Sequence, residues 1–399
     1  MNNNKTIWII NQYSGSQFHG MEYRHYYLAK EFLKAGHQVM IFSGSFSHLF
    51  KIQPDISDSF EFQNIDGITY CWVKIPKYKK SVSLGRFINM MAFAWKLRQF
   101  KIDNYPKPDA IIVSSPSLFP VVTARNWAKR LNAKMIFEIR DIWPLTLQEL
   151  SGLKTWHPLN LVLAFFEKYG YAKADKIVTL LPDAFLHFKK FNVAPEKVFT
   201  IPNGIFIDEN EKSEKFDLNL PNEKYIVGYL GSIGKSNALD YLIHAINQLK
   251  SNENLYFVLV GKGAEKERLQ NLITNPNVKW FDAVDKVFVP SVLAQFDICY
   301  IGWHNIKLYE MGISANKIFD YMYAAKPIIH SNNASNDLIK IANCGISVAA
   351  EDAQEIADAI LKLANMSSSE RQKMGQNGKD FVMKNHTYKK LANDYISII

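Results

Sequence analysis

The sequence predicts an α/β protein made of two doubly wound, Rossmann-like domains that face a central cleft. Three observations lead to this prediction: a length of 399 residues, apolar strands that alternate with amphipathic helices, and a restart of that alternation after a polar stretch. A chain of this length exceeds one ordinary domain. Its 48% hydrophobic and 13% aromatic residues supply enough apolar side chains for two cores.

The first half begins with a strand, a helix and a second strand. "TIWIINQY" from Thr6 is typical of a buried strand, the helix after it ends at Gly36, and the second strand covers 38–42. The alternation continues with strands in 109–115, 134–141 and 175–181 and with helices between them. We therefore expect residues 1–201 to form one parallel sheet covered by helices.

The second half repeats this organisation after a linker. Residues 202–223 are polar, acidic and rich in Pro and Asn, which is typical of a linker. Strands and helices resume over 224–385, beginning with "KYIVGYLGS" and "ALDYLIHAINQLK". A last helix at 386–399 could close either domain, and we expect it to complete the first. Ligands of such folds bind at the carboxyl ends of the strands.

Charge and cysteine content narrow the choice of partner and compartment. Residues 1–200 carry 26 Lys and Arg against 15 Asp and Glu, whereas the rest carries 21 against 23. The basic half fits an anionic partner, although a solvated basic surface explains the charge equally well. Nucleic acid is not expected, because no aromatic-basic readout motif accompanies the charge. Three cysteines without paired spacing favour the reducing cytoplasm over a disulfide framework.

Two features bear on membranes. No apolar run approaches the roughly 20 residues that a membrane-spanning helix needs, and the first residues do not resemble a signal peptide. The polybasic stretch 74–80 precedes an amphipathic stretch, 86–102, with Phe, Met and Trp on one side. Packing of this helix on its own domain is favoured. The alternative is a peripheral contact with the anionic inner face of the cytoplasmic membrane.

The segment "EMGISANKIFDYMYAAKPII", residues 310–329, places a polar run before a short helix that ends at a proline. A helix amino terminus exposes backbone N–H groups and a partial positive charge, which suit a phosphate group. Lys317 opposes the preference for acidic side chains in the first turn, and such an exception suggests function. Asp320 obeys that preference, so it fits either a helix-dipole partner or an acceptor for ribose hydroxyls.

Two glycine-containing turns follow strands of the second half. "YLGSIGKS" holds Gly231, Ser232 and Lys235, and "VGKG" holds Gly261 and Lys262. Neither has the spacing of a known phosphate-binding loop, so each alone more often marks a tight strand-to-helix connection.

The first half offers two further candidate groups. Arg140 and Asp141 come directly after a strand, and we favour a functional charge pair over a local turn at this place. Gly20, before the first helix, would let a substrate approach the backbone closely. The residues that follow it, Glu22, Arg24 and His25, are candidates too, although Arg24 and His25 more often lie on a solvated helix face.

A loop of the second half, "GWHNIKLYE", carries His304 and Glu310, and a single loop histidine is weak evidence of catalysis. No His, Cys or Asp cluster has zinc spacing, and no D-x-D pair or G-x-S-x-G elbow occurs. The sequence therefore predicts neither a metal site nor a serine hydrolase.

Taken together, the blocks resemble the retaining glycosyltransferases of family 4, which have the GT-B fold. The resemblance covers nearly the whole chain: "HGMEYRHYYLAKEFLKAGHQVMIFSG", "IPNGIFID", "GYLGS" with "LDYLIHAI", "FVLVGKGAEKERL" and "NKIFDYMYAAKPII". "EIRDIWP" and "NKIFDYM" are similar to segments of bacterial enzymes that build O-antigen or capsular polysaccharide, including fucosamine-type aminosugar transferases.

The resemblance implies transfer of a sugar from a nucleotide-sugar on the second domain to a glycan or undecaprenyl-diphosphate-linked acceptor on the first, with retained configuration and without metal or cofactor. It implies the following nucleotide-sugar residues: Gly20, Gly231, Ser232, Lys235, Gly261, Lys262, Val284, Ser314, Ala315, Asn316 and Asp320. The catalytic candidates are Lys317, Arg140, Asp141 and Glu310, and those on the acceptor side are Glu22, Arg24 and His304.

The sequence departs from the family pattern at three places. The first acid of the E-x7-E motif falls at Gly312, with Glu310 two positions early, and the histidine often found before Asp141 is Arg140. The two cations that usually meet the diphosphate fall at Ser232 and Asn237. We expect Lys317, with Lys235 and Arg140, to replace them.

Two alternatives to a transferase remain open at this point. A nucleotide-sugar 2-epimerase shares the two-domain architecture and would need no acceptor. A non-catalytic nucleotide-sugar binding protein would also fit the altered motif residues.

Overall fold

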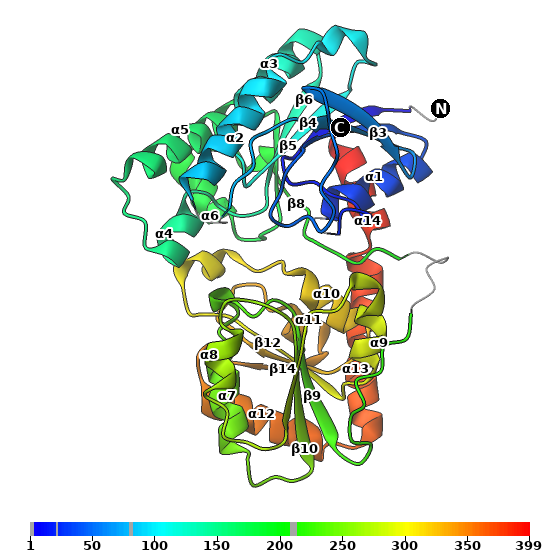
Figure 1. Ribbon diagram of the computed structural model, residues 1–399, viewed down its shortest axis with the longest axis vertical. Helices are drawn as coiled ribbons and strands as arrows, with labels where there is room; N and C mark the ends of the chain where they lie inside the picture. Colours follow the sequence, from blue (N-terminus) through cyan, green and yellow to red (C-terminus); the bar gives the residue numbers. More distant parts are fainter. Residues whose placement is uncertain (1–3, 21–22, 80–82, 208–213) are drawn as a thin grey trace. The chain divides into compact units, whose positions relative to one another are not determined.

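The computed structural model describes residues 4–20, 23–79, 83–207 and 214–399. The chain divides into two compact units (Figure 1). Unit 1 contains the residues up to Pro202 together with Tyr388–Ile399, and unit 2 contains Asn203–Thr387. Each unit is a doubly wound α/β sheet with helices on its faces, as the sequence predicts.

The described part of unit 1 has an eight-stranded sheet in the order β3-β4-β2-β1-β5-β6-β7-β8. All neighbours pair in parallel except β3 and β4. The strands are β1 (Thr6–Ile10), β2 (Gln38–Gly44), β3 (Phe60–Ile65), β4 (Ile68–Val73), β5 (Ala110–Ser114), β6 (Lys134–Ile139), β7 (Lys176–Thr179) and β8 (Val198–Thr200).

The antiparallel hairpin β3–β4 and the edge strand β8 are the parts of this sheet that were not predicted from the sequence. Asp66 and Gly67 join the two strands with φ angles of 51° and 84°. A two-residue turn with positive φ at both positions matches the twist of antiparallel strands, and Asp-Gly is a typical sequence for it. The dipeptide was therefore an available signal.

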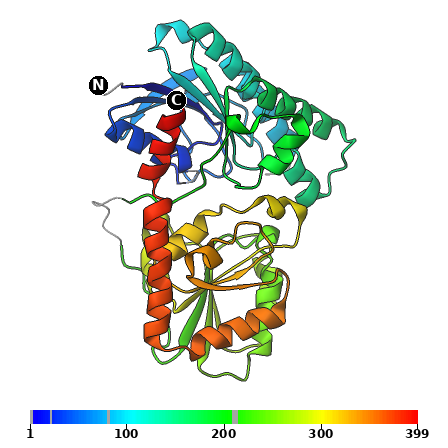
Figure 2. The same ribbon diagram turned by 180° about the vertical axis from the view of Figure 1, so that it is seen from behind.

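The helices of unit 1 are α1 (Arg24–Lys34), α2 (Leu84–Leu97), α3 (Pro120–Leu131), α4 (Leu145–Ser151), α5 (Pro158–Lys173), α6 (Phe185–Phe188) and α14 (Tyr388–Ile398), with 3₁₀ turns η1 (Ile102–Asn104), η2 (Lys189–Phe191) and η3 (Pro195–Lys197). Helix α3 packs against both α2 and α5, and α1 packs against α14 (Figures 1 and 2). Among the described residues, no helix is long and apolar enough to cross a membrane.

The described part of unit 2 has a six-stranded parallel sheet in the order β11-β10-β9-β12-β13-β14. The strands are β9 (Tyr225–Leu230), β10 (Leu255–Val260), β11 (Val278–Phe281), β12 (Ile298–Gly302), β13 (Ile328–Ser331) and β14 (Gly345–Val348). The helices are α7 (Leu239–Gln248), α8 (Lys266–Gln270), α9 (Val289–Ala294), α10 (Asn316–Tyr323), α11 (Leu338–Ala342), α12 (Ala353–Asn365) and α13 (Ser368–Asn385), with 3₁₀ turns η4 (Lys235–Asn237), η5 (Lys286–Phe288) and η6 (Lys307–Met311).

The predicted linker is part of unit 2 where the structure describes it. Ile205 and Leu218 are buried in the apolar core that also contains Ile226 and Phe296. The backbone N–H of Ile205 donates to the carbonyl oxygen of His386 at 2.8 Å. Its composition is that of a linker, but a few apolar side chains anchor the segment to the sheet.

Both sheets change winding direction in the middle. In unit 1 the chain passes from β1 to β2 on one side and returns to β5 on the other, and in unit 2 the same switch lies between β9 and β12. Doubly wound sheets bind ligands in the crevice at the carboxyl ends of the strands that flank such a switch point. The residues after these strands are therefore the first place to look for a site.

Candidate functional site

Lys317 lies at the switch point of unit 2. It is the second residue of α10, and its Nζ lies 4.8 Å from the ring centroid of Tyr229 and 5.6 Å from that of Trp303. Tyr229 belongs to β9 and Trp303 follows β12 directly. The amino group is thus held between the carboxyl ends of the two strands where ligands of this fold bind.

The hydrogen-bond partners that the structure gives the Lys317 amino group are neutral. Its Nζ donates to the Tyr229 hydroxyl at 3.0 Å and to Oδ1 of Asn237. The Tyr229 hydroxyl in turn donates to the carbonyl oxygen of Ser232 at 2.5 Å, and Asn237 Nδ2 donates to the same oxygen at 3.0 Å. Burial lowers the pKa of Lys317 to about 7. A bound anion would favour the charged form of this amine.

The glycine turn after β9 borders that amino group. A Cβ on Gly231 would lie 3.2 Å from Lys317 Nζ, so a side chain there would crowd the amine. A Cβ on Gly261 would lie 1.9 Å from the Gly231 carbonyl oxygen, and one on Gly263 would lie 2.0 Å from the Ile233 carbonyl oxygen. Only glycine permits the turns after β9 and β10 to approach this closely. The lack of a side chain at Gly261 therefore lets the two turns approach each other, and the lack of one at Gly231 leaves the Lys317 amino group uncrowded.

The loop before α10 is fixed by two asparagines of unit 2. Asn203 donates its backbone N–H to Ser314 Oγ at 2.8 Å and its side-chain Nδ2 to the Ser314 carbonyl oxygen at 2.6 Å. Asn336 binds the backbone of Ile313 on both sides, at 2.6 and 2.9 Å. These contacts orient the amino terminus of α10, whose first backbone N–H groups have no partner within the helix. The hydroxyl and the carbonyl oxygen of Ser314 are both engaged in holding this loop.

Asp320 faces a lysine that the sequence analysis did not single out. Its Oδ1 accepts from Nζ of Lys286 at 2.6 Å. Lys286 opens η5, two residues after Val284, in the connection that follows β11. Because Lys317 and Asp320 are three residues apart, they lie on one face of α10. From the amino terminus of α10 onward, that face carries first the Lys317 amine and then the Asp320 carboxylate.

His304 lies in unit 2 beside the glycine turn. Its Nδ1 lies 2.6 Å from Glu351 Oε1, and its Nε2 lies 2.8 Å from the carbonyl oxygen of Lys235. The prediction placed His304 on the acceptor side. Its contacts in the structure are to Glu351 and to the backbone of Lys235, a residue predicted for the nucleotide-sugar, and its role toward an acceptor stays a prediction. Glu351 was not singled out from the sequence.

The remaining candidates of unit 2 are more exposed. Glu310 lies in η6 with its side chain in solvent, and Asn316 and Lys262 are exposed as well. Ala315 precedes α10 and is half-buried. Gly312 has a φ of 104°, a conformation that glycine adopts without strain, where the family pattern has an acid. No contact in the structure brings Glu310 to Lys317 among the residues described.

In unit 1, Arg140 and Asp141 follow β6. Their backbone N–H groups both point to Ser115 Oγ, at 2.9 and 3.5 Å, and Asp141 is exposed. Gly20 has a φ of 87°, and a Cβ there would lie 2.9 Å from the side chain of Lys51. The Ser115 hydroxyl therefore holds the backbone at Arg140 and Asp141. Glu22 lies outside the described residues.

Arg24 corrects a prediction. Its side chain is buried; Nε pairs with Glu138 Oε2 at 2.9 Å, while Nη1 and Nη2 donate to the carbonyl oxygens of Pro202 and Ile201 at 2.7 and 2.8 Å. The neighbouring His25 is also buried, 2.8 Å from Glu138 Oε1. These side chains do not lie on a solvated helix face, and Arg24 is not available to an acceptor. The sequence missed Glu138, the carboxylate that makes burial of both residues tolerable.

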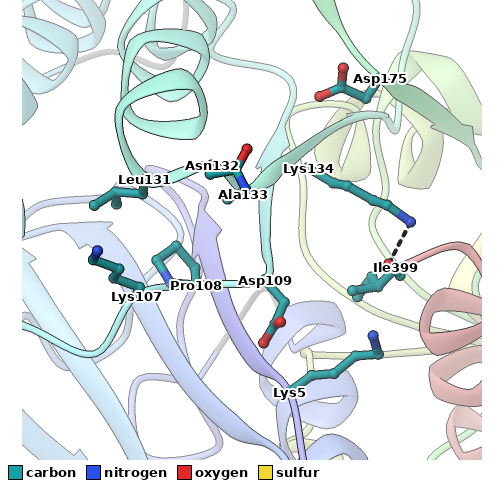
Figure 3. Close-up of a pocket in the computed structure, with 10 residues that line it drawn as sticks. All are labelled: Lys5, Lys107, Pro108, Asp109, Leu131, Asn132, Ala133, Lys134, Asp175 and Ile399. Atoms are coloured by element: carbon teal, nitrogen blue, oxygen red, sulfur yellow. Dashed lines mark hydrogen bonds between the residues drawn. The ribbon is translucent and has the colours of Figure 1, made fainter. Parts of the chain in front are cut away.

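A pocket of about 500 Å³ lies elsewhere in unit 1 (Figure 3). Lys5, Lys107, Asp109 and Lys134 line it, and Lys134 Nζ donates to the carbonyl oxygen of Ile399 at 2.6 Å. This pocket borders the amino ends of β1, β5 and β6, the edge opposite to the one where this fold binds ligands. The described residues also contain no group of three or more His, Cys, Asp or Glu side chains that could hold a metal ion.

Comparison with known proteins gives two family matches. Residues 18–209 match the model for glycosyltransferase family 4, and residues 224–366 match that for group 1 glycosyl transferases. WcaI of Escherichia coli K12, a glycosyl transferase named for colanic acid biosynthesis, is 26% identical over 258 residues. That match covers 61% of this chain and 63% of WcaI, so it spans less than two thirds of the relative.

Solved structures show the same fold at low sequence identity. Sucrose-phosphate synthase of Thermosynechococcus elongatus has a TM-score of 0.75 at 15% identity and matches 99% of this chain and 98% of that one. A trehalose-6-phosphate protein of Escherichia coli, bound with UDP-2-fluoro glucose, has a TM-score of 0.71 at 12% identity, covering 98% of each chain. HepE of Anabaena, in complex with UDP and glucose, has a TM-score of 0.66 at 13% identity, covering 99% of each.

These likenesses confirm the predicted fold class, because the matched structures are glycosyltransferases of the GT-B type. The two family models together cover the strands of both sheets except β1, and the segment that carries Lys317. The chain thus combines a segment that matches glycosyltransferase family 4, residues 18–209, with one that matches the group 1 glycosyl transferases, residues 224–366, on the GT-B fold.

Proposed function

We propose that the protein is a retaining, metal-independent glycosyltransferase of bacterial surface polysaccharide synthesis. It moves a sugar, for which an N-acetylated aminosugar is the expected class, from a nucleotide-sugar to a hydroxyl of a glycan or lipid-linked acceptor. The two family matches and the likeness to WcaI support the reaction class and the setting. Solved structures of the same fold that contain UDP or a UDP-sugar support the donor class.

The observation that carries this proposal is the position of Lys317. Its amino group lies at the unit 2 switch point, bounded by Gly231, by two aromatic rings and by neutral hydrogen-bond acceptors. An ammonium has three protons, and the structure uses two of them, on Tyr229 and Asn237. A diphosphate oxygen beside Gly231 supplies the third acceptor and the missing negative charge.

The chemistry follows from where negative charge develops. When the bond between the anomeric carbon and the donor phosphate breaks, its electron pair stays on the phosphate oxygen. The Lys317 ammonium and the first backbone N–H groups of α10 stabilise that charge. The acceptor hydroxyl attacks the same face of the sugar and passes its proton to the departing diphosphate. Configuration is then retained, and no side-chain base is needed.

Asn237 explains how one lysine replaces a lost cation. The family pattern has a cation at this position, and here the shorter amide binds Nζ of Lys317. Lys317 of α10 therefore places its charge where a cationic side chain after β9 would otherwise lie. Asp320, one turn further along α10, is assigned to the ribose hydroxyls.

The experiment is a comparison of Lys317→Met with wild type. A thermal-shift screen of nucleoside diphosphates and nucleotide-sugars first identifies the donor, with a metal chelator present throughout. Transfer to a polysaccharide-repeat acceptor is then followed by mass spectrometry. We expect Lys317→Met to lower turnover ~100-fold or more, the scale of a lost oxyanion donor.

Lys362→Met is the matched control, since Lys362 is exposed on α12 and should leave turnover unchanged. Equal turnover by Lys317→Met and wild type would remove Lys317 from the mechanism. Conversion of the nucleotide-sugar without any acceptor would favour the epimerase. Binding without turnover under any condition would favour a binding protein.

A further inference from the structure

Helix α2 presents an unpartnered apolar stripe to solvent. Its exposed large side chains are Leu84, Ile88, Met91 and Trp95, of which Leu84 is 73% and Trp95 62% exposed. Their spacing of four, three and four residues places them on one face of the helix. The opposite face is buried on unit 1 through Met90, Phe93 and Leu97. The helix is therefore apolar on two sides, which packing within unit 1 does not explain.

Helix α5 has the same property. Its outer side chains Leu161, Val162 and Phe165 are exposed, with Phe165 at 62%, and Trp156 just before the helix is 71% exposed. Leu163 and Tyr171 face the core instead. From the sequence, this apolar run is typical of a buried helix, yet a whole side of it lies in solvent.

The two stripes belong to one side of the unit 1 sheet. Helix α3 lies between α2 and α5 and packs against both (Figure 1). Phe119 at the start of α3 joins them, with its ring centroid 5.4 Å from Phe87 of α2 and 4.9 Å from Phe166 of α5. We call the exposed stripe residues of α2 and α5, together with Trp156, the α2–α5 surface.

The charges that helices α2 and α5 themselves expose are of one sign. Between Leu84 and Ile102 the sequence has Arg86, Lys96, Arg98 and Lys101 and no acid. Arg98 places its guanidinium 5.7 Å from the ring centroid of Trp95. On α5, Lys168 and Lys173 are exposed.

The acid of α5 does not offset these cations. Glu167 is buried, and its Oε1 accepts from the Tyr171 hydroxyl at 2.9 Å and lies 2.8 Å from Nε2 of His187. The solvent side of the surface therefore joins exposed apolar groups to a cationic rim.

We propose that the α2–α5 surface docks on an anionic lipid bilayer. Exposed apolar side chains, including two tryptophans, on helices whose exposed charges are Lys and Arg match the boundary between acyl chains and anionic headgroups. A second copy of the chain would bring the same cations against one another, because a symmetric contact pairs the same patch. The inference goes beyond the proposed function, because it does not require that the acceptor is itself a lipid.

The test is co-sedimentation of the full chain with vesicles, in the absence of any nucleotide. Vesicles of one part phosphatidylglycerol to two parts phosphatidylcholine should bind the wild type at least ~10-fold better than phosphatidylcholine alone, since each cation near an anionic surface adds to the affinity. Raising salt from about 0.1 M to about 0.5 M should weaken this binding by screening.

Two double variants locate the contact. Ile88→Ser with Trp95→Ser, and separately Leu161→Ser with Phe165→Ser, should each reduce partitioning ~10-fold or more, because each removes large apolar groups from the contact. Leu272→Ser with Ile341→Ser is the matched control, since both residues are exposed apolar side chains of unit 2. All replaced side chains are exposed, and unchanged thermal melting verifies the fold of each variant.

Brominated lipid acyl chains should quench the tryptophan fluorescence of the wild type, and should quench that of Trp95→Phe less. Three results would overturn the proposal: no binding to anionic vesicles, equal loss in the control pair, or a dimer in solution that the same surface variants abolish. Nucleotide affinity, measured in parallel by calorimetry, should be unchanged in the surface variants. Failure of docking is thereby distinguished from failure of the proposed transferase activity.

Discussion

The switch points of the two sheets each hold an ionisable group, the buried Glu138 in unit 1 and the half-buried Lys317 in unit 2. Among the described residues, only Glu138 has opposite charge beside it. In unit 1, Glu138 pairs with Arg24 and His25 and also accepts from the hydroxyls of Ser114 and Tyr395. In unit 2, the amino group of Lys317 meets the neutral side chains of Tyr229 and Asn237. The first arrangement is complete in itself, whereas the contacts described for the second give the amino group no counter-charge.

The ionisation of the two groups differs accordingly. Burial alone would oppose a charged Glu138, yet Arg24 and His25 beside it hold the pKa of that carboxyl well below its usual range. Burial lowers the pKa of Lys317 to about 7, and in the part of the chain that the structure describes no acid raises it again. A compensated charge is a structural element, whereas an uncompensated one at a ligand crevice indicates a binding site.

The largest expected effect is on the compensated site. Glu138→Ala leaves Arg24 buried without its carboxylate, so we expect about 3–5 kcal/mol of destabilisation. Differential scanning calorimetry at neutral pH measures it as a lower melting temperature of unit 1. The exposed carboxylate of Asp358 on α12 provides the control, Asp358→Ala, which should melt like wild type. An unchanged melting temperature for Glu138→Ala would refute the structural role of this network.

At the Lys317 site, the expected effect is a dependence of folding stability on pH. The folded pKa of Lys317, about 7, lies below its ordinary value of 10.5, so the unfolded chain binds more protons between these values. Lys317 therefore makes stability rise with pH across that window, by up to about 1.4 kcal/mol per pH unit. Lys317→Met should lack this contribution, and melting temperatures of variant and wild type measured from neutral to alkaline pH provide the check. Parallel curves would contradict the lowered pKa.

A smaller effect is expected for the carboxylate one turn further along α10. Asp320→Asn keeps the shape but loses the charge that pairs with Lys286 and is assigned to the ribose. We expect nucleoside diphosphate affinity to fall ~10-fold, about the strength of one hydrogen bond to a charged group. Calorimetry with the 2′-deoxy nucleotide supplies the control, because wild type should discriminate against it and Asp320→Asn should not. Equal discrimination by both would reject the ribose assignment.

The sequence predicted the parts that depend on local pattern. Strands such as β1 and β10 are continuous apolar runs, and α1 and α7 have helical spacing, so the two-sheet architecture followed from periodicity. The choice of Lys317 as a candidate also rests on local pattern, because a lysine in the first turn of a helix opposes a local rule, and its role stays a prediction. A residue that violates such a rule is a better pointer to function than one that obeys it.

The rest depends on contacts between distant segments. Glu138 meets Tyr395 across 257 positions, and Asn203 meets Ser314 across 111, so no local pattern indicates either pair. Arg24 was predicted on a surface because burial of an arginine requires a partner that only the folded chain supplies. The apolar run of α5 was likewise uninformative about exposure, since periodicity does not say which side of an apolar helix remains uncovered.

The measurement that tests the central claim most directly is the proton balance of nucleotide binding. Nucleoside diphosphate is titrated calorimetrically into the wild type at about pH 8, in two buffers of different ionisation enthalpy. Free Lys317 is largely neutral at that pH, and a bound diphosphate should raise its pKa, so we predict uptake of about one proton per nucleotide in wild type and none in Lys317→Met. Binding without proton uptake, and with equal affinity in the variant, would contradict the account.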